Sequence, residues 1–73
     1  MPNGYELRAA RDLLGWEQRQ LARAAGLNVS TVNRMEKSAG RSVRGRAENL
    51  QKVMDALGRE GVEFIDGGVR KVR

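Results

Sequence analysis

Residues 18–36 have the sequence QRQLARAAGLNVSTVNRME, and this stretch decides the fold. Apolar residues recur in it at intervals of three and four, first over residues 17–25 and again over residues 29–37, which predicts two short amphipathic helices. Gly26 stands between them and favours the left-handed conformation that ends a helix, and Asn28 is a good N-cap for the second helix. We therefore expect two helices joined by one tight turn.

The residue types in this stretch fit a close crossing of the two helices. Ala22 is small enough for the second helix to approach, and Gly26 permits the turn. The apolar residues that would join the pair are Leu21, Leu27, Val32 and Met35. This is the spacing of a helix-turn-helix.

Two more helices are expected around this pair. Apolar residues at helical spacing predict one helix over residues 6–14 and a longer one over about 46–60, which Gly58 or Gly61 would end. Residues 38–45 contain two glycines and two arginines and are predicted to form a loop. The bulk of the chain is therefore helical.

The C-terminal end has a different pattern. Residues 62–65 and 69–72 are two β-prone runs separated by Asp66-Gly67-Gly68, which predicts a hairpin. A two-stranded hairpin is marginal alone, so its apolar face needs either the protein's own helices or a second subunit. Our hypothesis is a homodimer formed through this hairpin. The residues predicted for dimerisation are Val62, Phe64, Val69 and Val72.

The expected fold class is all-α, a helix-turn-helix bundle of four helices with a C-terminal β-hairpin. Residues 1–4 would be a flexible N-terminal tail, residues 5–60 the helix-turn-helix domain, and residues 61–73 the hairpin. The length of 73 residues fits one domain, near the lower limit for a single hydrophobic core.

The composition excludes most enzyme mechanisms. The chain has no cysteine and no histidine, so disulfides, thiolate zinc sites and imidazole chemistry are absent. Its nine carboxylates are scattered among basic residues. We expect no enzymatic activity, no catalytic residue, no cofactor and no metal.

The charge favours a polyanionic partner. A net charge of +5 makes nucleic acid the first candidate. No segment has the long apolar run of a membrane span. We expect a soluble cytoplasmic protein associated with the nucleoid.

The chain resembles the lambda-repressor-like, Cro-type (XRE) family of helix-turn-helix regulators over roughly residues 5–60. The residues in register with the family pattern are Gln18, Leu21-Ala22, Gly26-Leu27, Asn28, Ser30-Thr31-Val32 and Arg34-Met35-Glu36. Two features depart from that pattern. Glu17 stands where the family usually has Ser or Thr as an N-cap, and a hairpin follows the fourth helix where many members have a fifth.

The resemblance implies that the helix at 29–37 enters the major groove of DNA. The residues expected to read bases are Val29, Ser30, Asn33 and Arg34. The residues expected to contact phosphates are Gln18, Arg19, Asn28, Thr31, Lys37, Arg41 and Arg44. The resemblance also implies a structural ion pair between Arg11 and Glu36.

The implied function is a bacterial or phage transcriptional regulator, a repressor that binds an inverted-repeat operator as a dimer. An autoregulator or an antitoxin fits the same sequence. A protein-interaction adaptor is an alternative of a different class, in which Asn33 and Arg34 would be dispensable. An RNA-binding module fits less well, because Tyr5, Trp16 and Phe64 are too far apart in sequence to suggest a stacking platform.

Overall fold

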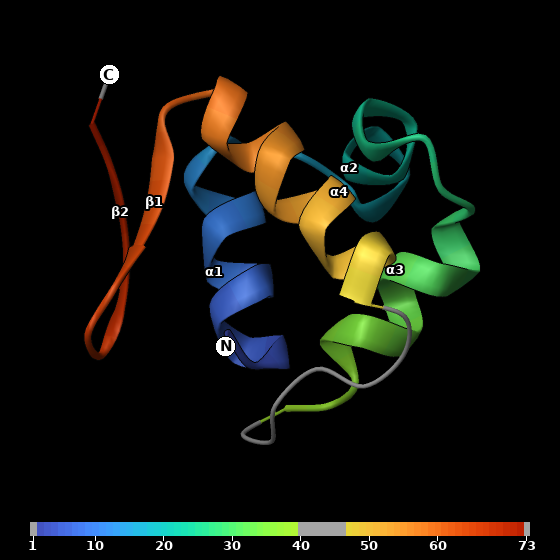
Figure 1. Ribbon diagram of the computed structural model, residues 1–73, viewed down its shortest axis with the longest axis horizontal. Helices are drawn as coiled ribbons and strands as arrows, with labels where there is room; N and C mark the ends of the chain where they lie inside the picture. The colour runs from blue at the N-terminus through green and yellow to red at the C-terminus, as the bar shows by residue number, and fades with distance from the viewer. Residues whose placement is uncertain (1, 40–46, 73) are drawn as a thin grey trace.

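The computed structural model describes residues 2–39 and 47–72. The described residues form the elements α1 (Gly4–Leu13), α2 (Gln18–Ala25), α3 (Val29–Glu36), α4 (Ala47–Arg59), β1 (Val62–Ile65) and β2 (Gly68–Lys71). In Figure 1 the hairpin lies on one side of the molecule and α2 and α3 on the other, with α1 and α4 between them. The predicted helical bundle with a C-terminal hairpin is confirmed.

One hydrophobic core joins these elements. It contains apolar residues from all four helices and from β1, namely Leu7, Ala10, Leu21, Ala22, Ala25, Val32, Met35, Leu50, Val53, Ala56, Leu57 and Val62. Burying this surface is the main source of stability in a domain of this size. None of the described helices combines the length and apolar character required to cross a bilayer.

The first helix begins earlier than its apolar pattern predicts. Asn3 caps α1, because its Oδ1 accepts the N–H of Glu6 at 2.9 Å while Glu6 Oε1 accepts the N–H of Asn3 at 2.9 Å. This reciprocal capping box satisfies two backbone donors at the helix start. Pro2 and Gly4 are buried. The predicted flexible tail is therefore wrong for residues 2–4.

The start of α1 docks against the end of α3. The N–H of Tyr5 donates to the carbonyl of Ala39 at 3.2 Å. A Cβ atom on Gly4 would lie closer than 3.0 Å to backbone atoms of Glu36 and Ala39, so only glycine fits this approach. Ala39 has φ of 52°, a left-handed conformation that is strained for a residue with a Cβ.

The turn between α2 and α3 follows the sequence prediction. Gly26 has φ of 71° and ends α2. The N–H of Leu27 donates a hydrogen bond to the carbonyl of Ala22 at 2.9 Å. Asn28 occupies the N-cap position of α3, but its side chain makes no capping hydrogen bond. The helix ends at Glu36, one residue before the predicted end.

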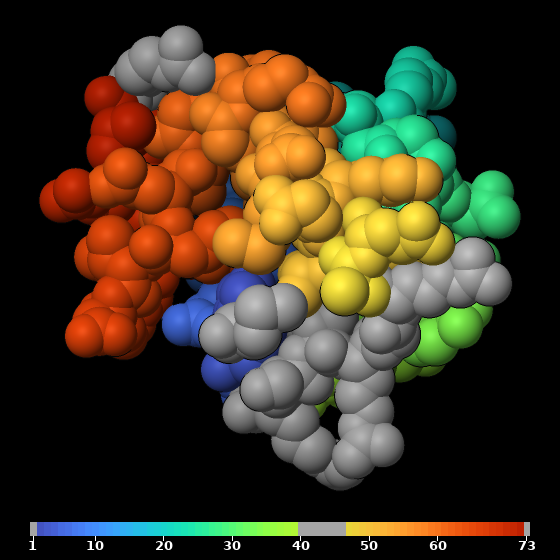
Figure 2. Space-filling view, in the orientation of Figure 1, coloured from blue at the N-terminus to red at the C-terminus, as the bar shows by residue number. Residues whose placement is uncertain are grey.

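The hairpin packs on the protein's own helices. Its strands pair antiparallel from Val62 opposite Lys71 to Ile65 opposite Gly68, which leaves a two-residue turn with Gly67 at φ of 80°. Gly68 thus belongs to β2 and not to the turn. In Figure 2 the hairpin forms one side of the molecule beside α4.

Packing of the hairpin changes the interpretation of its apolar residues. Val62 is only 4% exposed, and Phe64 and Val69 pack against the core. Of the four residues predicted for dimerisation, Val72 is the one with a largely free side chain, at 52% exposed. The prediction is therefore wrong for Val62, because a residue in the monomer core offers no surface to a second subunit.

Candidate nucleic-acid interface

The third helix has one buried and one exposed side. Val32 and Met35 point into the core and are 1% and 4% exposed. On the other side, Ser30 and Arg34 are exposed and Val29 is 47% exposed. Because residues three and four apart share a helix face, one short helix can be held by its inner residues and still present its outer ones.

Asn33 differs from the other three residues predicted to read bases. It is half-buried, and its Nδ2 donates to Oε1 of Gln18 at 3.2 Å. One atom of the Asn33 amide is thus engaged with the first residue of α2, whereas Val29, Ser30 and Arg34 lie on the exposed face.

An ion pair fastens α1 to the end of α3. Arg11 Nε donates to Glu36 Oε2 at 2.8 Å and Arg11 Nη2 donates to Glu36 Oε1 at 3.0 Å. The two side chains are 13% and 6% exposed, so water screens this bidentate pair only weakly. The hydrogen bond with Glu36 raises the pKa of Arg11, and burial opposes that rise.

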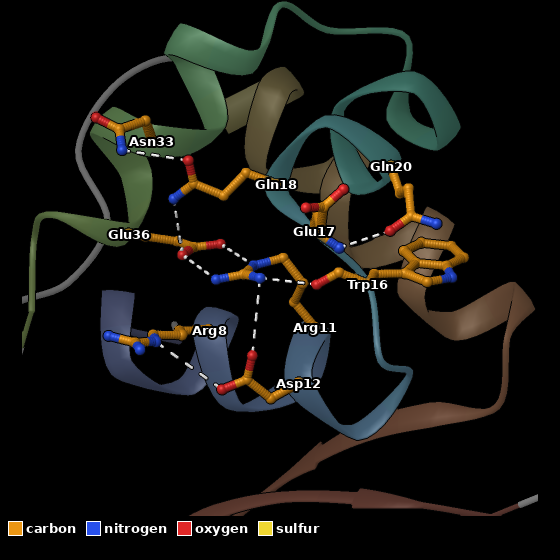
Figure 3. Close-up of polar contacts among 9 residues, drawn as sticks. All are labelled: Arg8, Arg11, Asp12, Trp16, Glu17, Gln18, Gln20, Asn33 and Glu36. Atoms are coloured by element: carbon orange, nitrogen blue, oxygen red, sulfur yellow. Dashed lines mark hydrogen bonds and ion pairs between the residues drawn. The ribbon is translucent and has the colours of Figure 1, made fainter.

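Arg11 also reaches the segment before α2. Its Nη1 donates to the carbonyl of Trp16 at 2.7 Å and lies 3.7 Å from a carboxylate oxygen of Asp12. Figure 3 shows the guanidinium between Glu36 on one side and the Trp16 carbonyl on the other. One side chain of α1 therefore fixes both the end of α3 and the approach to α2.

Gln18 continues this chain of contacts toward α3. Its Nε2 donates to Glu36 Oε1 at 3.0 Å, and its Oε1 accepts from Asn33. Four side chains from three helices therefore form one hydrogen-bonded series, which Figure 3 displays and which we call the polar relay: Arg11, Glu36, Gln18 and Asn33. The pair between Arg11 and Glu36 was expected from the family resemblance, whereas the two hydrogen bonds of Gln18 were not predicted.

The other residues predicted to contact phosphate lie at the ends of α2 and α3. Arg19 is exposed, and its Nη2 lies 3.1 Å from Oε1 of Glu17. Asn28 is exposed and Thr31 is half-buried at the start of α3, while Lys37 is exposed at its end. The two remaining candidates, Arg41 and Arg44, lie outside the described residues.

The start of α2 tolerates the unusual residue at its N-cap. The N–H of Glu17 donates to Oε1 of Gln20 at 2.7 Å, which satisfies one backbone donor. Trp16, just before it, packs against the core at the position of a hydrophobic staple to Leu21.

Within residues 2–39 and 47–72, no group of three or more acidic residues could hold a metal ion.

A short helix pair with a glycine turn, an inner apolar face and an exposed polar outer face on its second helix defines a helix-turn-helix DNA-binding domain. The chain matches the model of the helix-turn-helix family HTH_3 over residues 7–64, and it belongs to this family of DNA-binding regulators. The resemblance to lambda-repressor-like regulators is thereby confirmed. Searches of curated proteins and of solved structures found no match.

Proposed function

We propose that the protein is a transcriptional repressor that reads the major groove of double-stranded DNA with α3 and binds an inverted-repeat operator as a homodimer. The observation that carries this proposal is the exposed outer face of α3, at Val29, Ser30 and Arg34, on a helix whose inner face is locked into the core. Such a repressor acts on the bacterial or phage genome, in the cytoplasm, by occluding RNA polymerase.

The outer face of α3 and the half-buried Asn33 beside it have side chains suited to base edges. Arg34 can donate two hydrogen bonds to guanine, Asn33 can pair with adenine, and Val29 can contact a thymine methyl group. Ser30 can donate or accept. Arg19 and Lys37 flank this face and would hold phosphates, which position the helix without specifying sequence.

The dimer contact would use the outer face of the hairpin. Side chains alternate between the two faces of a strand, so one face of the hairpin carries Glu63, Ile65, Gly68 and Arg70. Val72 continues this face just after β2. Ile65 and Val72 are 43% and 52% exposed, and an ion pair between Glu63 and Arg70 lies between them. Sedimentation of the wild type should give a dimer at micromolar concentration, and Val72→Asp should shift it toward monomer. A monomeric wild type would refute the dimer.

The DNA-binding proposal is tested by selection from a random duplex library, followed by anisotropy titrations on the enriched sequence. We expect an inverted repeat with half-sites about 34 Å apart, one helical turn. Arg34→Ala should relax preference at one base pair per half-site by about tenfold, within the range for a bidentate contact.

The matched control is Arg8→Ala, which removes the same charge from α1 at a side chain that is 70% exposed and belongs neither to α3 nor to the proposed dimer face. This variant should keep the sequence preference. If selection enriches nothing and binding is weak and steeply dependent on salt, sequence reading is refuted and the adaptor alternative is favoured.

A further inference from the structure

The polar relay has charged groups at one end and a base-reading candidate at the other. Arg11 can only donate hydrogen bonds, and the Glu36 carboxylate can only accept them. Glu36 Oε1, at 3.0 Å from Gln18, therefore requires the nitrogen of the Gln18 amide and not its oxygen. The amide of Gln18 has only one orientation that satisfies this contact.

The orientation of the Gln18 amide also determines the orientation of the Asn33 amide. With its nitrogen on Glu36, Gln18 presents its oxygen to Asn33, at 3.2 Å. An oxygen accepts and does not donate, so Asn33 must direct its Nδ2 toward Gln18. If the Asn33 amide turned over, two oxygens would face each other and the hydrogen bond would be lost.

The fixed amide leaves a defined pair of groups for a ligand. The Asn33 nitrogen carries two hydrogens, and Gln18 uses one of them. The second hydrogen and Oδ1 remain as a neighbouring donor and acceptor. This pair matches the major-groove edge of adenine, which has N7 as an acceptor and the N6 amino group as a donor, whereas guanine offers two acceptors there.

We propose that Gln18 is a positioning residue for base specificity, an inference that rests on the proposed function. The polar relay locks the Asn33 amide in the orientation that selects adenine over guanine. Gln18 would then act through Asn33 and not as a phosphate contact. The burial of Glu36, whose side chain is 6% exposed, supports this role, because a carboxylate shielded from water holds its partners in place more strongly.

The test compares Gln18→Met with Asn33→Ala and Arg19→Met on the selected operator. Asn33→Ala identifies the base pair that Asn33 reads. Gln18→Met should lower the preference for adenine over guanine at that same base pair by about tenfold, within the discrimination of one bidentate pair. In the Asn33→Ala background, Gln18→Met should cause no further change in this base preference. Arg19→Met, the comparison on the same helix, should weaken binding to all sequences alike and reduce the salt slope by about one.

A uniform loss of affinity in Gln18→Met, with a salt slope reduced by about one, would overturn the proposal and assign Gln18 to a phosphate. An unchanged preference for adenine would overturn it as well.

A second measurement uses the protein without DNA. In nitrogen-15 NMR spectra, the side-chain amide of Asn33 should show one hydrogen-bonded proton in the wild type and lose that signature in Gln18→Met. An Asn33 amide with the same shifts in both proteins would refute the relay even if the protein binds DNA specifically. Failure of the wild type to select any sequence would instead refute the proposed function, and this spectrum would still test the relay.

Discussion

Replacing Arg11 by methionine should destabilise the protein by about 3 kcal/mol, at the low end of the cost of removing one partner from a buried ion pair. Arg11→Met keeps a side chain of similar length but leaves the Glu36 carboxylate, 6% exposed, with Gln18 as its remaining hydrogen-bond donor among the described contacts. A domain of 73 residues has a total stability of about 4–11 kcal/mol, so this loss is a large share of it.

The assay is urea unfolding followed by circular dichroism and by the fluorescence of Trp16. With a slope of about 1 kcal/mol per molar urea, the midpoint should fall by about 3 M. The control is Arg8→Met on the same helix, where the pair with Asp12 spans 3.8 Å and the side chains are 70% and 59% exposed. That variant should lose less than about 0.5 kcal/mol.

A double variant separates the cost of leaving the Glu36 carboxylate buried without Arg11 from the loss of the ion pair itself. Arg11→Met with Glu36→Leu removes both charges, and a buried pair replaced by apolar residues is often neutral in stability. The double variant should therefore recover at least half of the loss. If Arg11→Met behaves like Arg8→Met, or if the double variant is no more stable than the single one, the reasoning about an uncompensated buried charge is refuted.

Other substitutions test the packing. Gly4→Ala should destabilise by about 2 kcal/mol, because its Cβ would meet the backbone of α3. Gly58→Ala, in open space inside α4, should stabilise by about 0.5–1 kcal/mol, and equal effects at the two glycines would contradict the close approach. Leu21→Ala should cost about 2–5 kcal/mol in thermal or urea unfolding, whereas Leu13→Ala, 44% exposed, should cost less than 1 kcal/mol. Ala39→Gly should gain about 1 kcal/mol by relieving its positive φ, and a loss in urea unfolding would argue against strain there.

The fold was predictable where the local signals were strong. The helical period of α4, the glycine after α2 and the Asp66-Gly67 turn each specify their own structure within a few residues. The start of α1 was missed because Pro2 and Gly4 suggested a loose end, although Asn3 followed three residues later by Glu6 is itself a capping-box pattern. The hairpin's apolar face was predictable, but what covers it was not, because alternation identifies a face and not its partner.

The candidate site was predictable only in part, for a similar reason. Helical geometry places Val29, Ser30 and Arg34 on one exposed side of α3, since their inner neighbours are apolar. The bonds of Gln18 depend on how α1, α2 and α3 cross, and no spacing in the sequence encodes those crossings. Asn33 is therefore half-buried and hydrogen-bonded to Gln18, and differs from the expectation for a free surface side chain.

The polar relay connects α1 to the end of α3, and under the proposed function this connection would make α1 part of what positions the base-reading side chains. Apolar contacts between α2 and α3 fix how closely the two helices approach, but they are not directional and tolerate small rotations. Charge-assisted hydrogen bonds restrict angles as well as distances. Arg11 makes such bonds to the end of α3 and donates to the carbonyl just before α2, so it holds both helices from outside the pair. Base reading requires side chains held to within about 0.5 Å, and this constraint is one that the apolar core alone does not provide.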